Sequence, residues 1–261
     1  MNIVMYQIDA FTRKRFSGNP AAVCVLDHWL TDSVLQNIAF ENNLSETAFI
    51  VKTDTGYDLR WFTPSCEVDL CGHATLASAY VVFKCINTHA QSVSFSTLSG
   101  TLVVKIDDNQ KLSMQFPSRA PVPVETNELI EKSFGVKPLQ VYKSRDLMVL
   151  FDSEKTVKNL SPDFAVLSQI KDCLGVIATA KGDTVDFVSR FFAPNAGVPE
   201  DPVTGSAHCT LTPFWANTLN KKLLHAQQVS TRGGELFCED KGEQVIISGY
   251  ATLFFKGTIY L

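Results

Sequence analysis

Two short segments place proton-transferring side chains around a glycine that begins a helix. The first reads DLCGHA at residues 69–74, and the second reads DPVTGSA at residues 201–207. A loop of small residues that enters a helix presents free backbone N–H groups at the positive end of the helix dipole. Such an end binds a carboxylate or phosphate without a basic side chain. The two segments therefore predict two sites for anionic groups, each beside side chains that can move a proton.

A third segment adds a candidate general base. Residues 43–47, NLSET, form a polar turn that leads into the apolar run AFIV at residues 48–51. A carboxylate at the entry of a buried strand loses hydration, which raises its pKa toward the working range of a base. Glu46 is therefore a candidate for proton abstraction.

The two glycine segments belong to an internal repeat. RWFTP at residues 60–64 precedes the first, and RFFAP at residues 190–194 precedes the second, so that Asp69 is matched with Asp201. Each copy predicts a strand, an acidic loop and an apolar helix. We expect two similar halves whose helix starts face a common cleft that holds a small acidic molecule.

The elements around the repeat are mostly strands, and the helices do not alternate strictly with them. That pattern favours an α+β fold over a doubly wound sheet. Three prolines in residues 117–123, PSRAPVP, mark a stiff connection. We place the halves at residues 1–117 and 118–252, and expect a helix capped by Ser161 that runs through Ile170.

Composition excludes several classes of protein. The net charge of −4 disfavours nucleic-acid binding, which needs clustered Lys and Arg. We expect no membrane span, because no apolar run is long enough, and no signal peptide at the N-terminus. Seven cysteines lack the spacing of a disulfide framework, which indicates reduced thiols in the cytoplasm. No dinucleotide, P-loop or zinc spacing is present, so we expect no cofactor and no metal.

Four blocks of the sequence are similar to signature blocks of the PhzF family, named for a phenazine-biosynthesis isomerase. They read FSGNPAAV at residues 16–23, LSETAF at 44–49, CGHAT at 71–75 and EDPVTGSA at 200–207. The match covers both halves in order. The resemblance implies a diaminopimelate-epimerase-like fold: two pseudo-two-fold-related domains, each a strand-rich barrel around a central helix. It also implies that the last strand, about residues 253–261, returns to the first domain.

The resemblance also implies an activity and site residues. The family enzyme moves a proton within a cyclic dihydroxy-dihydroanthranilate-type acid without metal or organic cofactor, and members are commonly homodimers. By resemblance the proton-transferring glutamate is Glu46, and the other active-site positions are His73, Asp201 and Ser206. The substrate, a small carboxylate-bearing molecule, is expected to contact Gly72, Ala74, Gly205 and Asn19.

Two other functions remain as alternatives. Racemases of this fold use one thiol from each half, and Cys71 precedes Gly72 where such a thiol would lie. The matching position before Gly205 is Thr204, whose hydroxyl is far too weak an acid for that role. The second alternative is a non-catalytic module that binds a ligand or a protein, because fold alone does not fix function.

Overall fold

The computed structural model describes residues 1–171 and 173–261, and it divides into two compact units. The first unit contains Met1–Gln115 and Ser248–Leu261, and the second contains Phe116–Ile247. The division lies after Gln115 rather than after Pro117, and the chain returns at Ser248 rather than at residue 253. The hydroxyls of Ser248 and Ser113 are hydrogen-bonded at 2.9 Å, which ties the start of the returning segment to the first unit.

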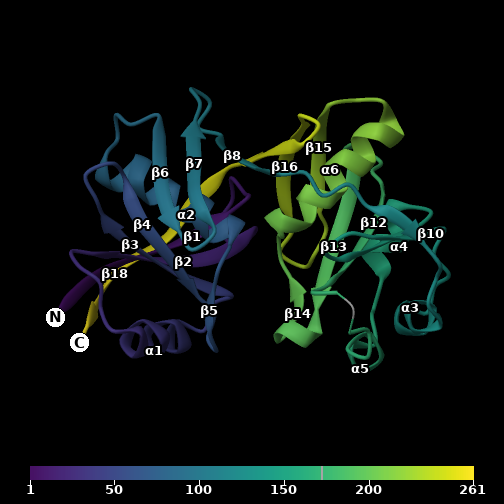
Figure 1. Cartoon of the computed structure of the whole chain (residues 1–261), viewed down its shortest axis with the longest axis horizontal. Coiled ribbons are helices and arrows are strands. Elements are labelled where there is room, and N and C mark those ends of the chain that lie inside the picture. Colours follow the sequence, from purple (N-terminus) through teal and green to yellow (C-terminus); the bar gives the residue numbers. More distant parts are fainter. Residues whose placement is uncertain (172) are drawn as a thin grey trace. The chain divides into compact units, whose positions relative to one another are not determined.

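The first unit is a curved succession of paired strands. The C-terminal strand β18 lies antiparallel to the N-terminal strand β1, from Asn2 opposite Tyr260 to Ala10 opposite Ala251, so the two ends of the chain share one edge of the unit (Figure 1). The elements are β1 Asn2–Ala10, β2 Asn19–Leu26, α1 Asp32–Asn42, β3 Glu46–Lys52, β4 Tyr57–Phe62, β5 Glu67–Val68, α2 Gly72–Val81, the π-helical turn η1 Val82–Ile86, β6 Ser92–Thr97, β7 Gly100–Ile106, β8 Leu112–Pro117 and β18 Ala251–Tyr260.

The central strands explain why this segment needs a crossover helix. In β2 and β3 most side chains are buried, as expected for strands covered on both faces. The two strands pair in parallel, with Ala21 beside Glu46, and parallel neighbours require a long connection. Helix α1 supplies it and ends at Asn43, a residue with a left-handed backbone (φ 48°). This turn places Glu46 at the entry of β3.

Helix α2 lies inside the first unit rather than on its surface. It packs against β1, β2 and β3, and eight of its ten residues are buried. A helix that is buried on nearly every side belongs to the centre of a domain. Small residues such as Ala74, Ala77 and Ser78 allow the strands to approach it closely. The first unit is thus a strand-rich shell around one helix.

The second unit repeats this connectivity. Its elements are β9 Val122–Val124, α3 Glu128–Phe134, β10 Gln140–Lys143, β11 Leu147–Leu150, α4 Glu154–Asn159, α5 Phe164–Leu167, β12 Val176–Lys181, β13 Phe187–Ala193, the 3₁₀ turn η2 Pro194–Ala196, β14 Val198–Asp201, α6 Gly205–Leu219, β15 Leu223–Gln228, β16 Gly234–Asp240 and β17 Gln244–Gly249. From β1 to β7 and from β10 to β16, successive pairings follow the same order of antiparallel and parallel partners. The sequence repeat is therefore a repeat of topology.

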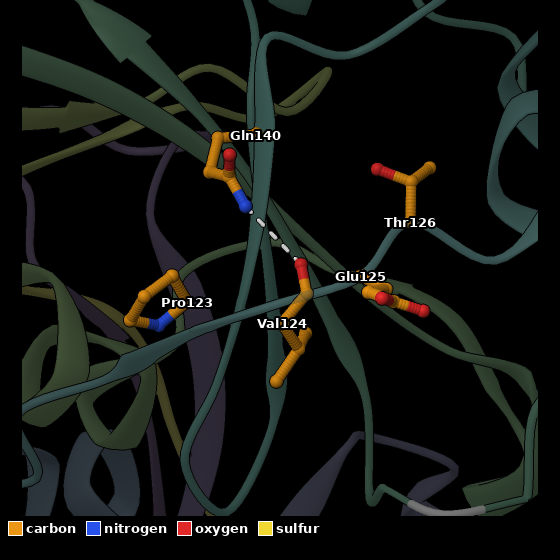
Figure 2. A pocket seen from close by; sticks show the side chains of 5 residues that line it. All are labelled: Pro123, Val124, Glu125, Thr126 and Gln140. Carbon is orange, nitrogen blue, oxygen red and sulfur yellow. Dashed lines mark hydrogen bonds between the residues drawn. The ribbon is translucent and has the colours of Figure 1, made fainter.

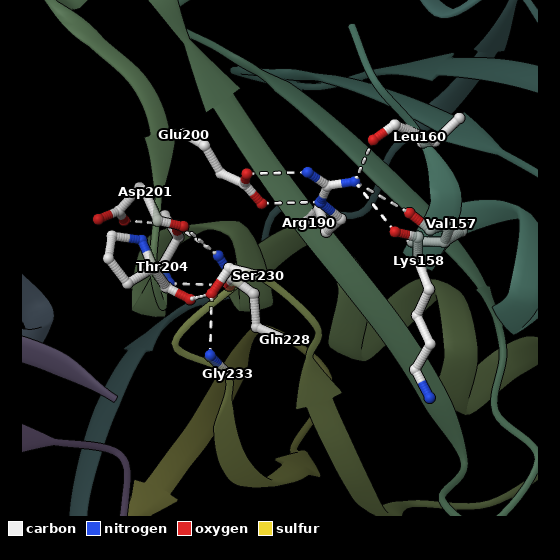
Figure 3. Close-up of polar contacts among 11 residues, drawn as sticks. Val157, Lys158, Leu160, Arg190, Glu200, Asp201, Thr204, Gln228, Ser230 and Gly233 are labelled. Atoms are coloured by element: carbon white, nitrogen blue, oxygen red, sulfur yellow. Dashed lines mark hydrogen bonds and ion pairs between the residues drawn. The ribbon is translucent and has the colours of Figure 1, made fainter. Parts of the chain in front are cut away.

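One ion pair recurs at the same place in both units. The guanidinium of Arg60 on β4 donates Nε and Nη2 hydrogen bonds to Glu67 on β5, both at 2.7 Å. Arg190 on β13 makes the same two bonds to Glu200 on β14, at 2.7 and 2.8 Å (Figure 3). Each pair closes the hairpin that leads to the central helix.

This pairing corrects the match between Asp69 and Asp201 expected from the sequence. Val68 lies opposite Trp61, and Asp201 lies opposite Phe191, so Asp201 occupies the place of Val68. From these two positions the distance along the chain to the helix glycine is the same in both units. The extra residues of the second copy lie earlier, in η2 and its exit at Gly197, whose φ of 78° favours glycine.

The helix expected from Ser161 to Ile170 is also corrected. The structure forms only the short helix α5 there, and its cap is Asp163, whose Oδ1 accepts from the backbone N–H groups of Ala165 and Val166. Asp163 directly precedes the helix, so its carboxylate can accept from two backbone donors of the first turn. Ser161 lies two residues earlier and is too distant to do so.

We predict that Arg190→Ala lowers the free energy of unfolding more than Arg60→Ala. Arg190 is less exposed than Arg60 (11% against 23% of the side chain) and also donates to the carbonyl of Leu160 at 2.6 Å. Its loss leaves a partly buried carboxylate and a backbone acceptor without their donor, at a cost of about 2–4 kcal/mol. Urea unfolding measures both variants. The exposed Lys155→Ala is the control, and equal losses at residues 60 and 190 would contradict the prediction.

Candidate active site

The first unit gathers four polar side chains at the start of α2. His73, in the first turn of the helix, lies with its Nε2 3.2 Å from Oε2 of Glu46, the first residue of β3. Its Nδ1 lies 3.3 Å from Nδ2 of Asn19 and 3.5 Å from Sγ of Cys71. Residues that are far apart in the sequence thus meet around a single imidazole.

The neighbours of His73 define its protonation. The ring is buried, and burial lowers its pKa from 6.5 to about 3, so the imidazole is neutral at physiological pH. The amide Nδ2 of Asn19 is a donor, and it therefore pairs with an unprotonated Nδ1. The ring proton then resides on Nε2, where it faces the carboxylate of Glu46. The contact joins a neutral N–H group to a carboxylate rather than two opposite charges.

The start of α2 leaves backbone donors available. Cys71 occupies the N-cap position, and its side chain makes no capping hydrogen bond. The first turn instead closes through the Cys71 carbonyl, which accepts from the hydroxyl of Thr75 at 2.5 Å and from the Thr75 backbone N–H at 3.1 Å. The backbone N–H groups of the first turn point toward the helix start, where they can donate hydrogen bonds to an anionic oxygen.

The corresponding helix start in the second unit is braced differently. Thr204 donates its hydroxyl to Oδ2 of Asp201 at 2.5 Å, and its backbone N–H donates to Oε1 of Gln228 at 2.8 Å. The amide of Gln228 returns to the carbonyl of Asp201 at 2.8 Å, and Ser230 donates to the carbonyl of Pro202 (Figure 3). This network fixes the loop from Asp201 to Gly205.

Ser206 contacts a charged pair that lies before β11. Nη2 of Arg145 donates to Oγ of Ser206 at 3.0 Å and to Oδ2 of Asp146 at 2.9 Å. The carboxyl of Asp146 is almost fully buried, whereas the Arg145 side chain is 31% exposed. The pair thus places a guanidinium at the start of α6.

His208 and Cys209 belong to the core of the second unit. Nδ1 of His208 donates to the Thr204 carbonyl at 2.8 Å, the same bond that Thr75 makes to Cys71 in the first unit. Burial lowers the pKa of His208 to about 4 and raises the pKa of Cys209 to about 11. These two residues therefore support the helix rather than present reactive groups.

The structure thus distributes the predicted site residues over two clusters. Glu46, His73 and Asn19 meet in the first unit, with Gly72 at the helix start and Ala74 buried behind it. In the second unit Asp201 braces the loop, Ser206 contacts Arg145, and Gly205 begins α6. Sequence reasoning missed Gln228 and Arg145. Residues 143–146, KSRD, are a polar entry to an apolar strand, the same signal that identified Glu46.

Among the described residues, one group combines enough donor types for a metal ion, namely Glu46, Cys71 and His73. Glu46 lies on the Nε2 side of the imidazole and Cys71 on the Nδ1 side. One ligand atom from each of the three residues lies within 4.8 Å of the other two. In the observed arrangement the carboxylate of Glu46 lies 3.2 Å from Nε2 of His73, and Cys71 lies against Nδ1.

Comparison with known proteins identifies the family. A model described as phenazine biosynthesis-like protein matches residues 8–257. The chain belongs to this family. It is 49% identical over 261 residues to an uncharacterized isomerase of Pseudomonas aeruginosa, with 100% of both chains covered. A crystal structure of a PhzF-family protein from Enterococcus faecalis covers 100% of both chains with 48% identity and a TM-score of 0.98.

A more distant comparison establishes the wider fold. A probable proline racemase from Agrobacterium radiobacter is similar with a TM-score of 0.65 at 10% identity, over 99% of this chain and 93% of that one. The expected α+β, epimerase-like fold of this PhzF-family member is confirmed. Helices in the described residues are too short or too polar to cross a bilayer.

A pocket of about 470 Å³ lies elsewhere in the second unit of this PhzF-family member, lined by Pro123, Val124, Glu125, Thr126 and Gln140. Figure 2 shows Gln140 donating to the Val124 carbonyl, a bond of 3.1 Å. Among the residues that line the pocket, the one ionisable side chain is that of Glu125, and it is exposed to solvent. The pocket offers no positioned acid or base, and none of the predicted site residues lines it.

We predict that the two buried histidines make stability depend on pH. Their pKa values in the folded state, about 3 for His73 and about 4 for His208, lie below the unfolded value of 6.5. Below that value the unfolded chain binds protons that the native state does not. Stability is therefore complete above pH 6.5 and decreases as the pH falls toward 4, by up to about 1.4 kcal/mol per pH unit for each histidine.

Urea unfolding at several pH values between 7 and 4.5 tests this dependence. His208→Asn keeps a donor for the Thr204 carbonyl but cannot titrate, so its slope should be shallower by about 1.4 kcal/mol per pH unit. The exposed His89→Asn is the control and should keep the original slope. A slope unchanged in His208→Asn would contradict the assignment of a neutral, buried imidazole.

Proposed function

We propose that this protein is an isomerase that moves a proton within a small carboxylate-bearing metabolite, with Glu46 as the acid and base. The observation that supports the proposal most directly is the contact between the Glu46 carboxylate and the neutral imidazole of His73. A relative that shares 49% of its residues is named an isomerase.

The chemistry follows from the states of these two groups. The carboxylate of Glu46 takes a proton from a carbon that a neighbouring unsaturated or carbonyl group activates, and the C–H electron pair passes into that group. The same carboxyl then returns the proton to another carbon. The Nε2–H of His73 orients the carboxylate, and Asn19 holds the imidazole in the required tautomer. The scheme needs no electron acceptor or metal.

The second unit serves substrate binding in this proposal. Asp201, Ser206 and the first-turn N–H groups after Gly205 hold and orient the substrate. Gly72 and Gly205 permit close approach of the backbone to the substrate. We further propose that the protein is cytoplasmic and acts as a homodimer. Light scattering of the purified protein tests the oligomeric state.

The two-thiol alternative lacks its second thiol at the expected position. Cys71 is matched by Thr204, whose hydroxyl is engaged with Asp201. Cys209, one turn further along α6, is buried, and burial raises its pKa. A carboxylate mechanism therefore fits the residues better than a thiol mechanism does.

Glu46→Gln should decrease turnover by about two to four orders of magnitude while ligand binding is retained. The amide preserves the shape of the side chain but cannot accept the proton. Cys71→Ala is the matched comparison and should have a much smaller effect. The two variants are assayed on one active substrate found by screening unsaturated and amino-substituted carboxylic acids. Loss of turnover in Cys71→Ala with activity retained in Glu46→Gln would replace the carboxylate mechanism by the thiol mechanism.

Turnover in heavy water should place deuterium in the product, because a carboxylate at a partly exposed site exchanges its proton with solvent between transfers. Proton and deuterium NMR of the same reaction follow the label. Prior treatment with a chelator should leave the rate unchanged. A rate that falls on chelation and recovers on addition of a metal ion would contradict a reaction carried by Glu46 alone.

A further inference from the structure

The two units share a framework but differ in the charge that they place beside the central helix. When the units are aligned on their Arg–Glu pairs, the strand register gives Glu46 the place of Gly175 and Pro20 the place of Arg145. In the first unit Arg60 lies opposite Phe49, which lies opposite Cys24. In the second unit Arg190 lies opposite Ala178, which lies opposite Val149. Counting back along each strand from these matched positions gives the two correspondences. One unit thus carries a carboxylate and the other a guanidinium.

The missing carboxylate in the second unit has a steric cause. A Cβ atom at Gly175 would lie 2.3 Å from Cζ of Phe191, so this position has no room for a side chain. In the observed packing the second unit thus has no side chain, and no base, where the first holds Glu46. Its charged group comes instead from the other strand of the pair, at Arg145.

Arg145 is held on one side and open on the other. Nε and Nη2 face Oδ2 of Asp146 at 3.3 and 2.9 Å, and Nη2 also reaches Ser206. Asp146 is only 1% exposed, so the anchor is rigid, while the Arg145 side chain is 31% exposed. Its Nη1 makes no hydrogen bond to the residues that the structure describes. Two N–H donors therefore point away from the anchor.

The same contact orients the hydroxyl of Ser206. Because Oγ accepts a hydrogen bond from Nη2, the hydroxyl proton is free to donate to another acceptor. Hydrogen bonds from a guanidinium to a carboxylate are stronger than neutral ones and carry directional specificity. The Arg145 Nη1 and the Ser206 hydroxyl together form a pair of donors suited to one anionic group.

We propose that Arg145 is the residue that binds the carboxylate of the substrate, together with the Ser206 hydroxyl at the start of α6. This inference rests on the proposed function for the identity of the bound molecule as a substrate. It adds that the second unit recognises a carboxylate specifically.

Binding of benzoate and of its neutral analogue benzamide tests the proposal by calorimetric titration. The full-length protein should bind benzoate at least tenfold more tightly than benzamide. Arg145→Gln should weaken benzoate binding by about 10–100-fold, the range for one charge-assisted interaction, and leave benzamide nearly unchanged. Arg145→Lys keeps the charge but not the planar fork, and should lie between the two.

Two further variants separate binding from folding. Arg145→Gln leaves the buried Asp146 carboxylate without its partner, so the double variant Arg145→Gln with Asp146→Asn removes both charges and should show the same loss of benzoate. The exposed Lys155→Gln, which removes one positive charge elsewhere in the unit, should bind like the unaltered protein.

The outcomes distinguish this inference from the proposed function. Glu46→Gln should bind benzoate normally even though it lacks turnover, so the binding result stands whether or not isomerisation is found. Equal affinity of the unaltered protein for benzoate and benzamide, or undetectable binding of benzoate, would overturn the role of Arg145. Benzoate binding that survives both Arg145→Gln and the double variant would do the same.

Discussion

Both halves depend on one contact, an arginine–glutamate pair. It joins a long strand (β4 or β13) to the short strand (β5 or β14) that precedes the central helix. It occurs between Arg60 and Glu67 and again between Arg190 and Glu200, with the same two hydrogen bonds each time. A bidentate pair of this kind fixes the direction as well as the distance of the two backbones. Each helix glycine therefore begins at a defined place, although the hairpins differ in length.

A repeated framework allows the two halves to diverge in chemistry. The first half places a carboxylate and a neutral imidazole at its helix start, and the second places a hydroxyl and a guanidinium there. The fourth residue of each helix makes the same bond with a different side chain. Thr75 and His208 differ in size and in functional group, yet both donate to the N-cap carbonyl. In the proposed function, proton transfer therefore belongs to one half and anion binding to the other.

The burial of His73 gives the cluster in the first half its electrostatic character. A charged imidazolium would neutralise the Glu46 carboxylate and weaken it as a base, whereas burial keeps the ring neutral. Asn19 supplies the donor that selects the tautomer. The cost of keeping an uncharged histidine in the interior appears as sensitivity to acid, since protonation favours the unfolded chain.

The sequence by itself determined the strand-rich α+β fold, the internal repeat, the two glycine helix starts and the candidates Glu46, His73, Asp201 and Ser206. The fold class, the repeat and the helix starts follow from local patterns of periodicity, turn residues and short motifs, whereas the roles of the four candidates come from the resemblance to the PhzF family. Only the tertiary structure decided which residues meet. Asn19 and Cys71 contact His73, Arg145 contacts Ser206, and Asp201 stands opposite Phe191 where the sequence matched it with Asp69. Such contacts depend on strand register and on burial. Both are determined jointly by residues that are far apart in the chain.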